Sequence, residues 1–395
     1  MSAGEISTRI ERGRSPFCYW LLPSAYPFLE DVLFRGDVQR GMRVSSLLTQ
    51  SQAVVCDSHE QLPAQFQEHV ASHRQGQLFN DGRWAQAMQQ AYGTRVFYLC
   101  ARRGDRTVGT LALTLQKSLL LGARLCSLPY LDASGLLADD SAACAALLDR
   151  ARLLMKEHGA GIVELRQQEV LEASLPMRTD KVTLKMPIGP APQQLLDGLK
   201  GPQRRNIRKV TADTSMRLLT GGADLLEDFY RVYLRNMRDL GSPPHSLRYF
   251  EVLLDLFAQA ARLFVIRRGD LPLAAAVSFP HGGQLHVPWV ASDRRFKKDL
   301  ANSLLYWRMF CYCCQERIGT FDFGRSTRGS GTYVFKQRWG AREIPLYWHY
   351  LLADGVAPPG IAQDSLPFRV AEACWRRLPL PVAAALGPRI ICKLS

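Results

Sequence analysis

Apolar and polar residues alternate with the period of a β-strand in two neighbouring runs, 95–103 and 106–116. The runs are joined by Gly104-Asp105, and a Gly-Asp pair between two such runs is typical of a β-hairpin. Further along, an Ala- and Leu-rich stretch at 141–158 has helical spacing and ends at a glycine. A short apolar run follows at 162–166, so the pattern predicts a hairpin, a helix and a buried strand in that order.

The same order returns in the second half of the chain. Strand-like runs at 262–268 and 271–279 flank another Gly-Asp pair, and a third run ends at Val287-Pro288-Trp289. A helix is predicted at 300–318 and a strand at 321–323. Two amphipathic helical stretches precede each hairpin, at 60–73, 82–92, 222–238 and 246–260.

The spacing of landmarks indicates a duplication. Three pairs are separated by nearly the same number of residues: 159 from Pro129 to Pro288, 160 from Gly159 to Gly319 and 158 from Glu164 to Asp322. The shared offset predicts an α/β protein built from two copies of one unit. A hairpin, a long helix and a further strand are the order expected of an acetyltransferase-like (GNAT) domain, a mixed sheet flanked by helices.

A Pro/Gly linker signal at 186–192 marks the junction between the copies. We therefore predict four segments: an N-terminal extension at 1–49, a first acetyltransferase-like domain at 50–190, a second, catalytic one at 191–355 and a C-terminal helical tail at 356–395. For the extension, two interpretations stay open, a disordered leader with one packed helix or a segment that docks on a membrane surface or partner.

The positive charge of the chain is concentrated in its second half. Of 395 residues 47% are hydrophobic, enough to bury real cores. The net charge is +14, and residues 186–395 alone carry 29 Lys and Arg against 17 Asp and Glu, a net +12. Such a surface attracts phosphates, nucleotides, nucleic acid or anionic lipid. The charge therefore narrows the class of binding partner but does not indicate which reaction is catalysed.

The cysteines and the apolar runs argue against several classes of protein, among them zinc-binding, secreted and membrane-spanning proteins. The ten cysteines form no CxxC pair, and the cluster Cys311, Cys313 and Cys314 lies in an apolar helical stretch without a histidine at chelating spacing. We expect core residues in a reducing compartment and no bound metal. Neither a secretory signal nor a run of about 18 apolar residues occurs. A cytoplasmic chain without a transmembrane segment is predicted.

Two basic segments are candidate phosphate sites. In 200–209, a helix beginning at Pro202 would place four cations on one face. A solvated helix face is the alternative. The segment 291–298 carries several cations and leads into the predicted helix at 300–318. Free backbone N–H groups and the helix dipole at the start of that helix favour binding of a donor's phosphates. A glycine-rich phosphate-binding loop is missing from the segment. The candidate residues are Arg204, Arg205, Arg208, Lys209, Arg294, Arg295, Lys297, Lys298 and Asn302.

The segment FDFGRSTRGSGTYVFKQRWGA at 321–341 is the most specific candidate for a reaction centre. Its glycines allow a sharp loop, and Lys336 and Arg325 are suited to hold the anionic intermediate of acyl transfer to an amine. Asp322 is either a weak base or an anchor for Arg325. In the alternative interpretation the segment is only a tight turn held by an Asp-Arg pair. The expected cleft residues are Trp289, Ser292, Tyr306, Tyr333 and Trp339.

Several segments resemble the FemAB-related proteins of PEP-CTERM/exosortase systems, in the Fem and BioF2-like branch of the acetyltransferase superfamily. They are VPWVAS (287–292), NSLLYW (302–307), FDFGRSTRGSGTYVFKQRWGA (321–341), LYWHYLL (346–352), RRNIRK (204–209), NMRDLG (236–241) and the tail at 375–390. The resemblance covers roughly 50–395. It implies acyl transfer, with the Phe335-Lys336 dipeptide at the reaction centre.

Two functions stay open on the sequence. In the first, the resemblance implies an acyl- or aminoacyl-transferase acting on an amine of a cell-envelope or exopolysaccharide-related acceptor, with acyl-CoA or aminoacyl-tRNA as donor. In the second, the basic cleft of a non-catalytic module holds RNA or a nucleotide-linked polymer in an exosortase-linked assembly. The partners expected are an anionic donor, tRNA as one candidate, and exopolysaccharide-biosynthesis proteins. The stretch LPYLDASGLL (128–137) departs from the LPYLNYGG-like pattern of the family.

Overall fold

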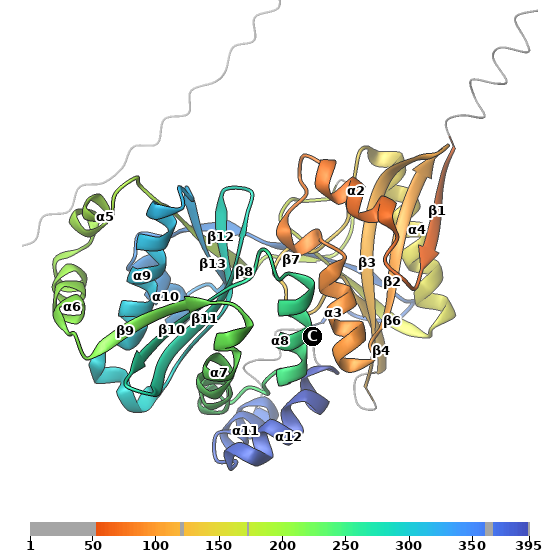
Figure 1. Cartoon of the computed structure of the whole chain (residues 1–395). Helices are drawn as coiled ribbons and strands as arrows, with labels where there is room; N and C mark the ends of the chain where they lie inside the picture. Colours follow the sequence, from red (N-terminus) through yellow and green to blue (C-terminus); the bar gives the residue numbers. More distant parts are fainter. Residues whose placement is uncertain (1–52, 119–121, 172–173, 360–365, 394–395) are drawn as a thin grey trace, which may run out of the picture. The chain divides into compact units, whose positions relative to one another are not determined.

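The computed structural model describes residues 53–118, 122–171, 174–359 and 366–393, which contain two β-sheets with helices on both faces of each (Figure 1). The predicted extension at 1–49 lies outside these residues. None of the described helices is both long and apolar enough to cross a bilayer.

The first sheet has eight strands, and β5 (Leu137–Ala138) pairs with β3 beside the main order. The others run across the sheet as β1 (Val54–His59), β2 (Arg95–Arg103), β3 (Arg106–Ser118), β4 (Gly122–Cys126), β6 (Ala160–Gln167), β15 (Tyr347–Leu352) and β7 (Met177–Arg178). Its helices are α2 (Ala64–Ser72), α3 (Arg83–Tyr92) and α4 (Ser141–Glu157). The short 3₁₀ helix η1 (Leu78–Asn80) lies between α2 and α3.

The second sheet has seven strands in the same spatial order. They are β9 (Met216–Gly221), β10 (Arg262–Arg268), β11 (Leu271–His281), β12 (Gln284–Ser292), β13 (Thr320–Thr327), β8 (Lys181–Pro187) and β14 (Arg342–Pro345). Its helices are α5 (Pro192–Gly198), α6 (Gly201–Ala212), η2 (Ala223–Leu225), α7 (Leu226–Leu240), α8 (Leu247–Leu256), η3 (Arg294–Asp299), α9 (Ala301–Gln315) and α10 (Gly331–Gln337). The tail forms α11 (Leu366–Trp375) and α12 (Leu380–Ile391).

The duplication predicted from the landmark spacing is present in the strand order. In each sheet a hairpin is followed by a strand, a long helix and a parallel strand: β4 pairs parallel with β6, and β12 pairs parallel with β13. The other main pairings are antiparallel. Apolar residues alternate between the two faces of β10, with Leu263 and Val265 packing toward α7 and α8 and Phe264 and Ile266 toward α6 and α9.

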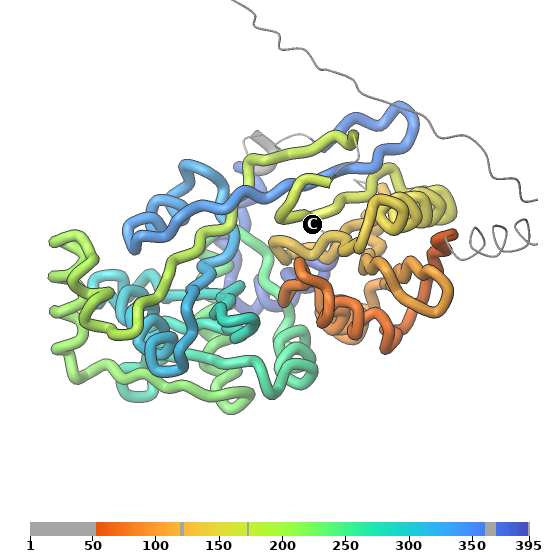
Figure 2. The backbone as a smooth tube through the Cα atoms, turned by 90° about the horizontal axis from the view of Figure 1, so that it is seen from above, coloured from red at the N-terminus to blue at the C-terminus, as the bar shows by residue number. Residues whose placement is uncertain are grey.

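Two strands cross the predicted domain boundary, because each pairs in the sheet of the other half. β8 was expected in the first domain but lies between β13 and β14 of the second sheet. β15 was expected in the second domain but lies between β6 and β7 of the first sheet. Figure 2 shows the two connecting segments crossing between the halves side by side. Apolar alternation predicts a strand but does not say which sheet receives it.

An aromatic cluster joins the halves in addition to the exchanged strands. Trp84 on α3 is fully buried, and its ring centroid lies 4.9 Å from that of Phe257 and 4.9 Å from that of Phe279. Trp289 on β12 lies 6.1 Å from Trp84 and 5.2 Å from Phe250 of α8, centroid to centroid. Because one apolar cluster contains side chains of both halves, neither half has a complete core alone.

We predict that Leu351 stabilises the first sheet although it comes from the second half of the sequence. The residue is 3% exposed on β15. Leu351→Ala should lower the free energy of unfolding by about 2–4 kcal/mol and reduce hydrogen-exchange protection in β6 before β13. Leu153→Ala, an exposed leucine on α4, is the matched control and should change stability by less than about 0.5 kcal/mol. Loss of protection confined to β13 would contradict the exchange.

Candidate active site

A cavity of about 250 Å³ opens where β12 and β13 separate. The two strands are paired only from Gln284 to His286 with Thr320 to Asp322. Beyond that point they diverge, and the cavity occupies the wedge between them. Its lining comes from both halves: Phe79, Tyr130, Leu131, Asp132, Val287, Pro288, Val290, Tyr306, Phe323, Gly324, Arg325, Thr332 and Lys336.

The wall of the wedge on β13 depends on the backbone at Gly324. This residue has φ +70°, a left-handed conformation that costs glycine little, and the register of β13 against β8 shifts between Asp322 and Arg325. Its N–H donates to Asp322 Oδ1 at 2.9 Å. Its carbonyl accepts from Lys336 Nζ at 2.8 Å. A side chain here would strain the backbone and move the wall of the cavity.

Lys336 is buried and comes from the short helix α10, which the sequence pattern did not predict. Ser330 caps this helix by accepting the backbone N–H of Tyr333 at 3.3 Å. Besides its bond to Gly324, Lys336 Nζ donates to the Arg325 carbonyl at 2.9 Å. Burial lowers the pKa of Lys336 to about 8, against the opposing pull of two nearby carboxylates. At neutral pH the ammonium is therefore present but close to its titration range.

Asp132 is a carboxylate in the cavity wall that the sequence analysis did not single out. It belongs to the first half, and its Oδ2 accepts the backbone N–H of Arg325 at 2.8 Å. Its Oδ1 lies 3.7 Å from Arg325 Nε. Burial raises the pKa of Asp132, although Arg325 and Lys336 oppose the rise. The departure of 128–137 from the family pattern was the one available signal for this residue.

Asp322 does not anchor Arg325, so that alternative from the sequence is wrong. Its Oδ1 accepts from Thr183 Oγ1 at 2.8 Å as well as from Gly324, and its Oδ2 lies 3.2 Å from His286 Nδ1 and 3.7 Å from Lys185 Nζ. Although burial raises the pKa of this carboxyl, these partners outweigh it and hold the pKa at about 2. Asp322 is thus an ionised structural group below the cavity and a poor base.

Tyr306 is the one expected cleft residue that lines the cavity. Trp289 lies in the aromatic contact between the halves. Trp339 is 3% exposed in the core of the second half, 5.1 Å from Phe310 by ring centroids. The remaining members of the set, and Phe335, lie near but outside the lining: Phe335 packs 5.3 Å from Tyr306, Tyr333 bonds Glu343, and the Ser292 carbonyl accepts from Asn236.

The predicted cations lie on two elements beside α9. Arg294, Lys297 and Lys298 are exposed on η3, which leads into α9 through Leu300 in a left-handed conformation. Within the described residues none of these three has an ionic partner, whereas Arg295 is paired with Asp293 at 2.7 Å. Asn302 stands in the first turn of α9.

The second cationic element, α6, packs against α9 through Ile207 and Val210. Its cations Arg205, Arg208 and Lys209 are exposed and Arg204 is half-buried, as the helix beginning at Pro202 predicted. In the part of the chain that the structure describes, none of the four has an ion-pair partner. Both elements thus offer positive charge without internal neutralisation.

The equivalent wedge in the first half is closed. Arg166 on β6 is 1% exposed and fills it, donating to Glu164 Oε1 at 2.7 Å and to the Leu131 carbonyl at 3.1 Å. Acids replace the cations at the start of α4, where Asp140 caps the helix and Asp139 precedes it. A larger hollow there, about 520 Å³, is lined by these acids and suits an anionic donor poorly. A further hollow of about 730 Å³ also lies away from the wedge.

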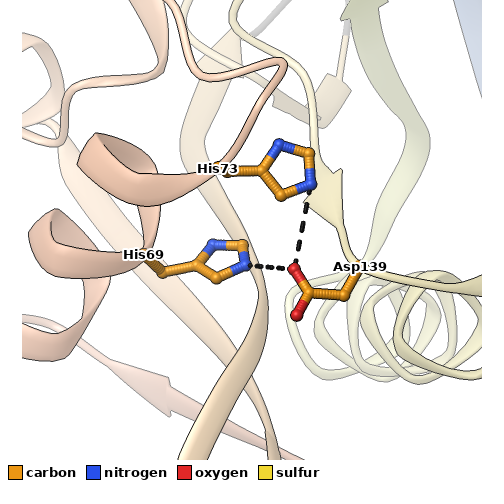
Figure 3. Close-up of side chains that lie close together, drawn as sticks. All are labelled: His69, His73 and Asp139. Carbon is orange, nitrogen blue, oxygen red and sulfur yellow. Dashed lines mark hydrogen bonds and ion pairs between the residues drawn. The ribbon is translucent and has the colours of Figure 1, made fainter.

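The structure also brings together His69, His73 and Asp139, a set that the sequence did not predict as ligands (Figure 3). His69 Nε2 and His73 Nε2 lie 3.2 and 3.9 Å from Asp139 Oδ1. His73 Nδ1 accepts the backbone N–H of Gln75 at 3.1 Å, so Nε2 carries the proton and donates to the Ala138 carbonyl at 3.3 Å. Arg106 binds the other carboxylate oxygen at 2.6 Å. The arrangement satisfies Asp139 by hydrogen bonds and fastens α2 to the start of α4.

Comparisons agree with this architecture. Residues 203–337 match the family model described as an acetyltransferase (GNAT) domain. The crystal structure of FemX is 16% identical over 75% of this chain and 97% of its own, with a TM-score of 0.58. The chain has the tandem GNAT fold. A tandem GNAT protein from the clavulanic acid biosynthesis pathway is 13% identical over 78% of this chain and 100% of its own, with a TM-score of 0.47.

L-PGS from Bacillus licheniformis is 12% identical over 74% of this chain and 91% of its own, with a TM-score of 0.47. Comparison with curated proteins finds no match. The fold class predicted from the duplication is confirmed, and the fold is shared with FemX. The matched GNAT segment contains α6, η3, α9, β13 and α10, and it supports an acyltransferase.

We predict that Asp132 holds the wedge in shape. Asp132→Ala leaves the Arg325 N–H without its acceptor and should lower the free energy of unfolding by about 1–3 kcal/mol in urea titrations. Asp132→Asn keeps an oxygen acceptor and should cost clearly less. Asp149→Ala removes an exposed carboxylate of α4 and should change stability by less than about 1 kcal/mol. If Asp132→Ala lowered the free energy of unfolding no more than this control does, the role of Asp132 in holding the wedge in shape would be refuted.

Proposed function

We propose that the chain is an acyl- or aminoacyl-transferase whose reaction takes place in the wedge between β12 and β13. The observation that carries this proposal is that Lys336 and Asp132 line the same cavity, a buried cation from the second half and a buried carboxylate from the first. The open wedge, the cations at its donor side and the GNAT match all lie in the same half.

In the proposed reaction an amine nitrogen attacks the carbonyl carbon of the bound acyl group. A C–N bond forms, and the C–S bond to CoA or the C–O bond to tRNA breaks as the tetrahedral intermediate collapses. Asp132 accepts the proton that the amine loses, because burial makes it the more basic of the two carboxylates near the site. The leaving thiolate or alkoxide takes that proton up.

Lys336 and the backbone that it fixes supply the electrostatic part. Two of its three N–H groups are used by the Gly324 and Arg325 carbonyls, which leaves one to face the cavity. Positive charge aimed at the developing oxyanion stabilises the transition state more than the ground state. The Phe335-Lys336 dipeptide thus owes its role to a lysine held rigidly by its own backbone contacts.

The donor's phosphates are proposed to lie at η3 and the start of α9. Arg294, Lys297 and Lys298 would bind them with side chains in place of a glycine-rich backbone loop. The cations of α6 extend this surface far enough to suit a polynucleotide donor. The acceptor proposed from the resemblance is an amine of a cell-envelope or exopolysaccharide-related molecule, and the exosortase association belongs to the same proposal.

Lys336→Met should lower turnover by about 10²- to 10³-fold, the usual loss on removing an oxyanion donor. The assay is amine-dependent release of CoA from acetyl-CoA, or of tRNA from aminoacyl-tRNA. Arg338→Met removes an exposed cation two residues away and should leave turnover within about twofold. Unchanged turnover in Lys336→Met, with intact folding, would remove Lys336 from the mechanism.

The pH dependence of the same assay follows from the lowered pKa of Lys336. The ammonium is present below pH 8 and lost above it, so turnover that needs this charge should fall as pH rises through about 8. In Lys336→Arg, whose guanidinium stays charged, the falling limb should move to higher pH. A wild-type limb that stays in place in Lys336→Arg would assign the titration to another group.

Two charge variants separate the donor classes. The triple variant Arg294→Ser, Lys297→Ser and Lys298→Ser should weaken binding of both CoA and tRNA. The triple variant Arg204→Ser, Arg205→Ser and Arg208→Ser should weaken binding of tRNA alone and reduce the salt dependence of that binding. Serine in place of the exposed first-half cations Arg74, Lys117 and Lys156 is the control with equal charge change. Salt-sensitive tRNA binding without turnover on any amine would favour the non-catalytic alternative.

A further inference from the structure

The C-terminal helix α12 presents an apolar stripe to solvent. Val382, Leu386 and Ile390 are spaced four residues apart, so they lie on one face, and they are 39%, 40% and 36% exposed. The buried face of the same helix is formed by Ala383 and Gly387. This buried face packs closely against Pro244, because a Cβ on Gly387 would lie 2.4 Å from Pro244 Cδ.

Cations flank this stripe. Arg389 is exposed on α12 and Lys393 is exposed just after its end, and neither has an ionic partner within the described residues. Exposed arginines continue the basic surface at the junction with α11, where Val370 is 53% exposed. From 369 to 393 the chain carries five Lys and Arg residues against a single acid, Glu372, which is bonded to Arg376.

We propose that α12 seats the chain on an anionic lipid bilayer. An exposed apolar stripe with cations beside it is the pattern of helices that lie in the plane of a membrane surface. The apolar side chains enter the acyl boundary while the Arg and Lys stems reach back to the lipid phosphates. At 12 residues, about 18 Å long, the helix is too short to cross a hydrocarbon core of about 30 Å.

Charge complementarity selects a bilayer over a protein partner. The centre of a protein interface is depleted of lysine, and an unpaired cation buried beside the stripe would need a matching acid. An anionic bilayer offers phosphates along the whole stripe. Docking does not depend on the proposed acyl transfer. The helix nevertheless contacts a residue that lines the cavity, because the Tyr130 hydroxyl donates to the Ile391 carbonyl at the end of α12.

Co-sedimentation of the full chain with lipid vesicles tests the proposal. Binding to phosphatidylcholine vesicles that contain phosphatidylglycerol should exceed binding to pure phosphatidylcholine by about tenfold or more, and should weaken at high salt. Leu386→Glu should reduce the partition coefficient by about tenfold, and Arg389→Gln with Lys393→Gln should abolish the preference for phosphatidylglycerol. Leu153→Glu, which places the same change at an exposed leucine of α4, should bind like the wild type.

Failure of the intact chain to bind either vesicle overturns the proposal. In that case a lower molar mass of Leu386→Glu by light scattering would show that a second copy covers the stripe. Vesicle binding that is unchanged in Leu386→Glu also overturns it and assigns the contact elsewhere, for example to residues 1–49. Circular dichroism and urea unfolding of each variant exclude misfolding, because Leu386 is exposed and its replacement should not change the stability of the core.

Discussion

The short backbone segment at Gly324 and Arg325 is the point on which the site depends. Asp132, from the other half, holds its N–H side, and Lys336 holds its two carbonyls. β12 and β13 are paired over only three positions, and the hydrogen bonds made by Asp132 and Lys336 hold the wall of the wedge beyond that point. The cavity therefore exists because side chains replace the ladder of hydrogen bonds that would otherwise close it.

The same segment explains why two charges are tolerated inside the protein. A buried ammonium or carboxylate is costly unless hydrogen bonds satisfy it, and here each charge is bonded to backbone that the fold needs in that place. The cost appears as shifted pKa values, lower for Lys336 and higher for Asp132. Shifts in these directions bring the pKa values of both groups closer to the neutral range, as is common at functional sites.

Sequence patterns predicted the elements better than their pairing. The strands at 95–103 and 262–268 have the predicted ends, and the helix expected at 141–158 extends over 141–157. These elements follow from local periodicity and glycine signals. The exchange of β8 and β15 has no local signal, because the apolar positions of each strand would be buried in either sheet.

The candidate site divides in the same way. Lys336 and Arg325 were singled out because glycines and cations are concentrated in one stretch of sequence, and both line the cavity. Asp132 was missed because its meaning comes from a contact 193 residues away. Asp322 was given the wrong partner since proximity in sequence suggested Arg325, whereas the pairing of the strands places its carboxylate against His286 and Thr183.

The reciprocal strand exchange has a consequence for the origin of the protein. Two identical subunits that trade their last strands form a closed, symmetric dimer, a common and inexpensive route to association. Joining such subunits end to end gives one polypeptide in which each sheet still borrows a strand from the other. A single polypeptide is not bound by such symmetry, so one half can keep an open wedge while the other places Arg166 in the corresponding position and contributes Asp132 to that wedge.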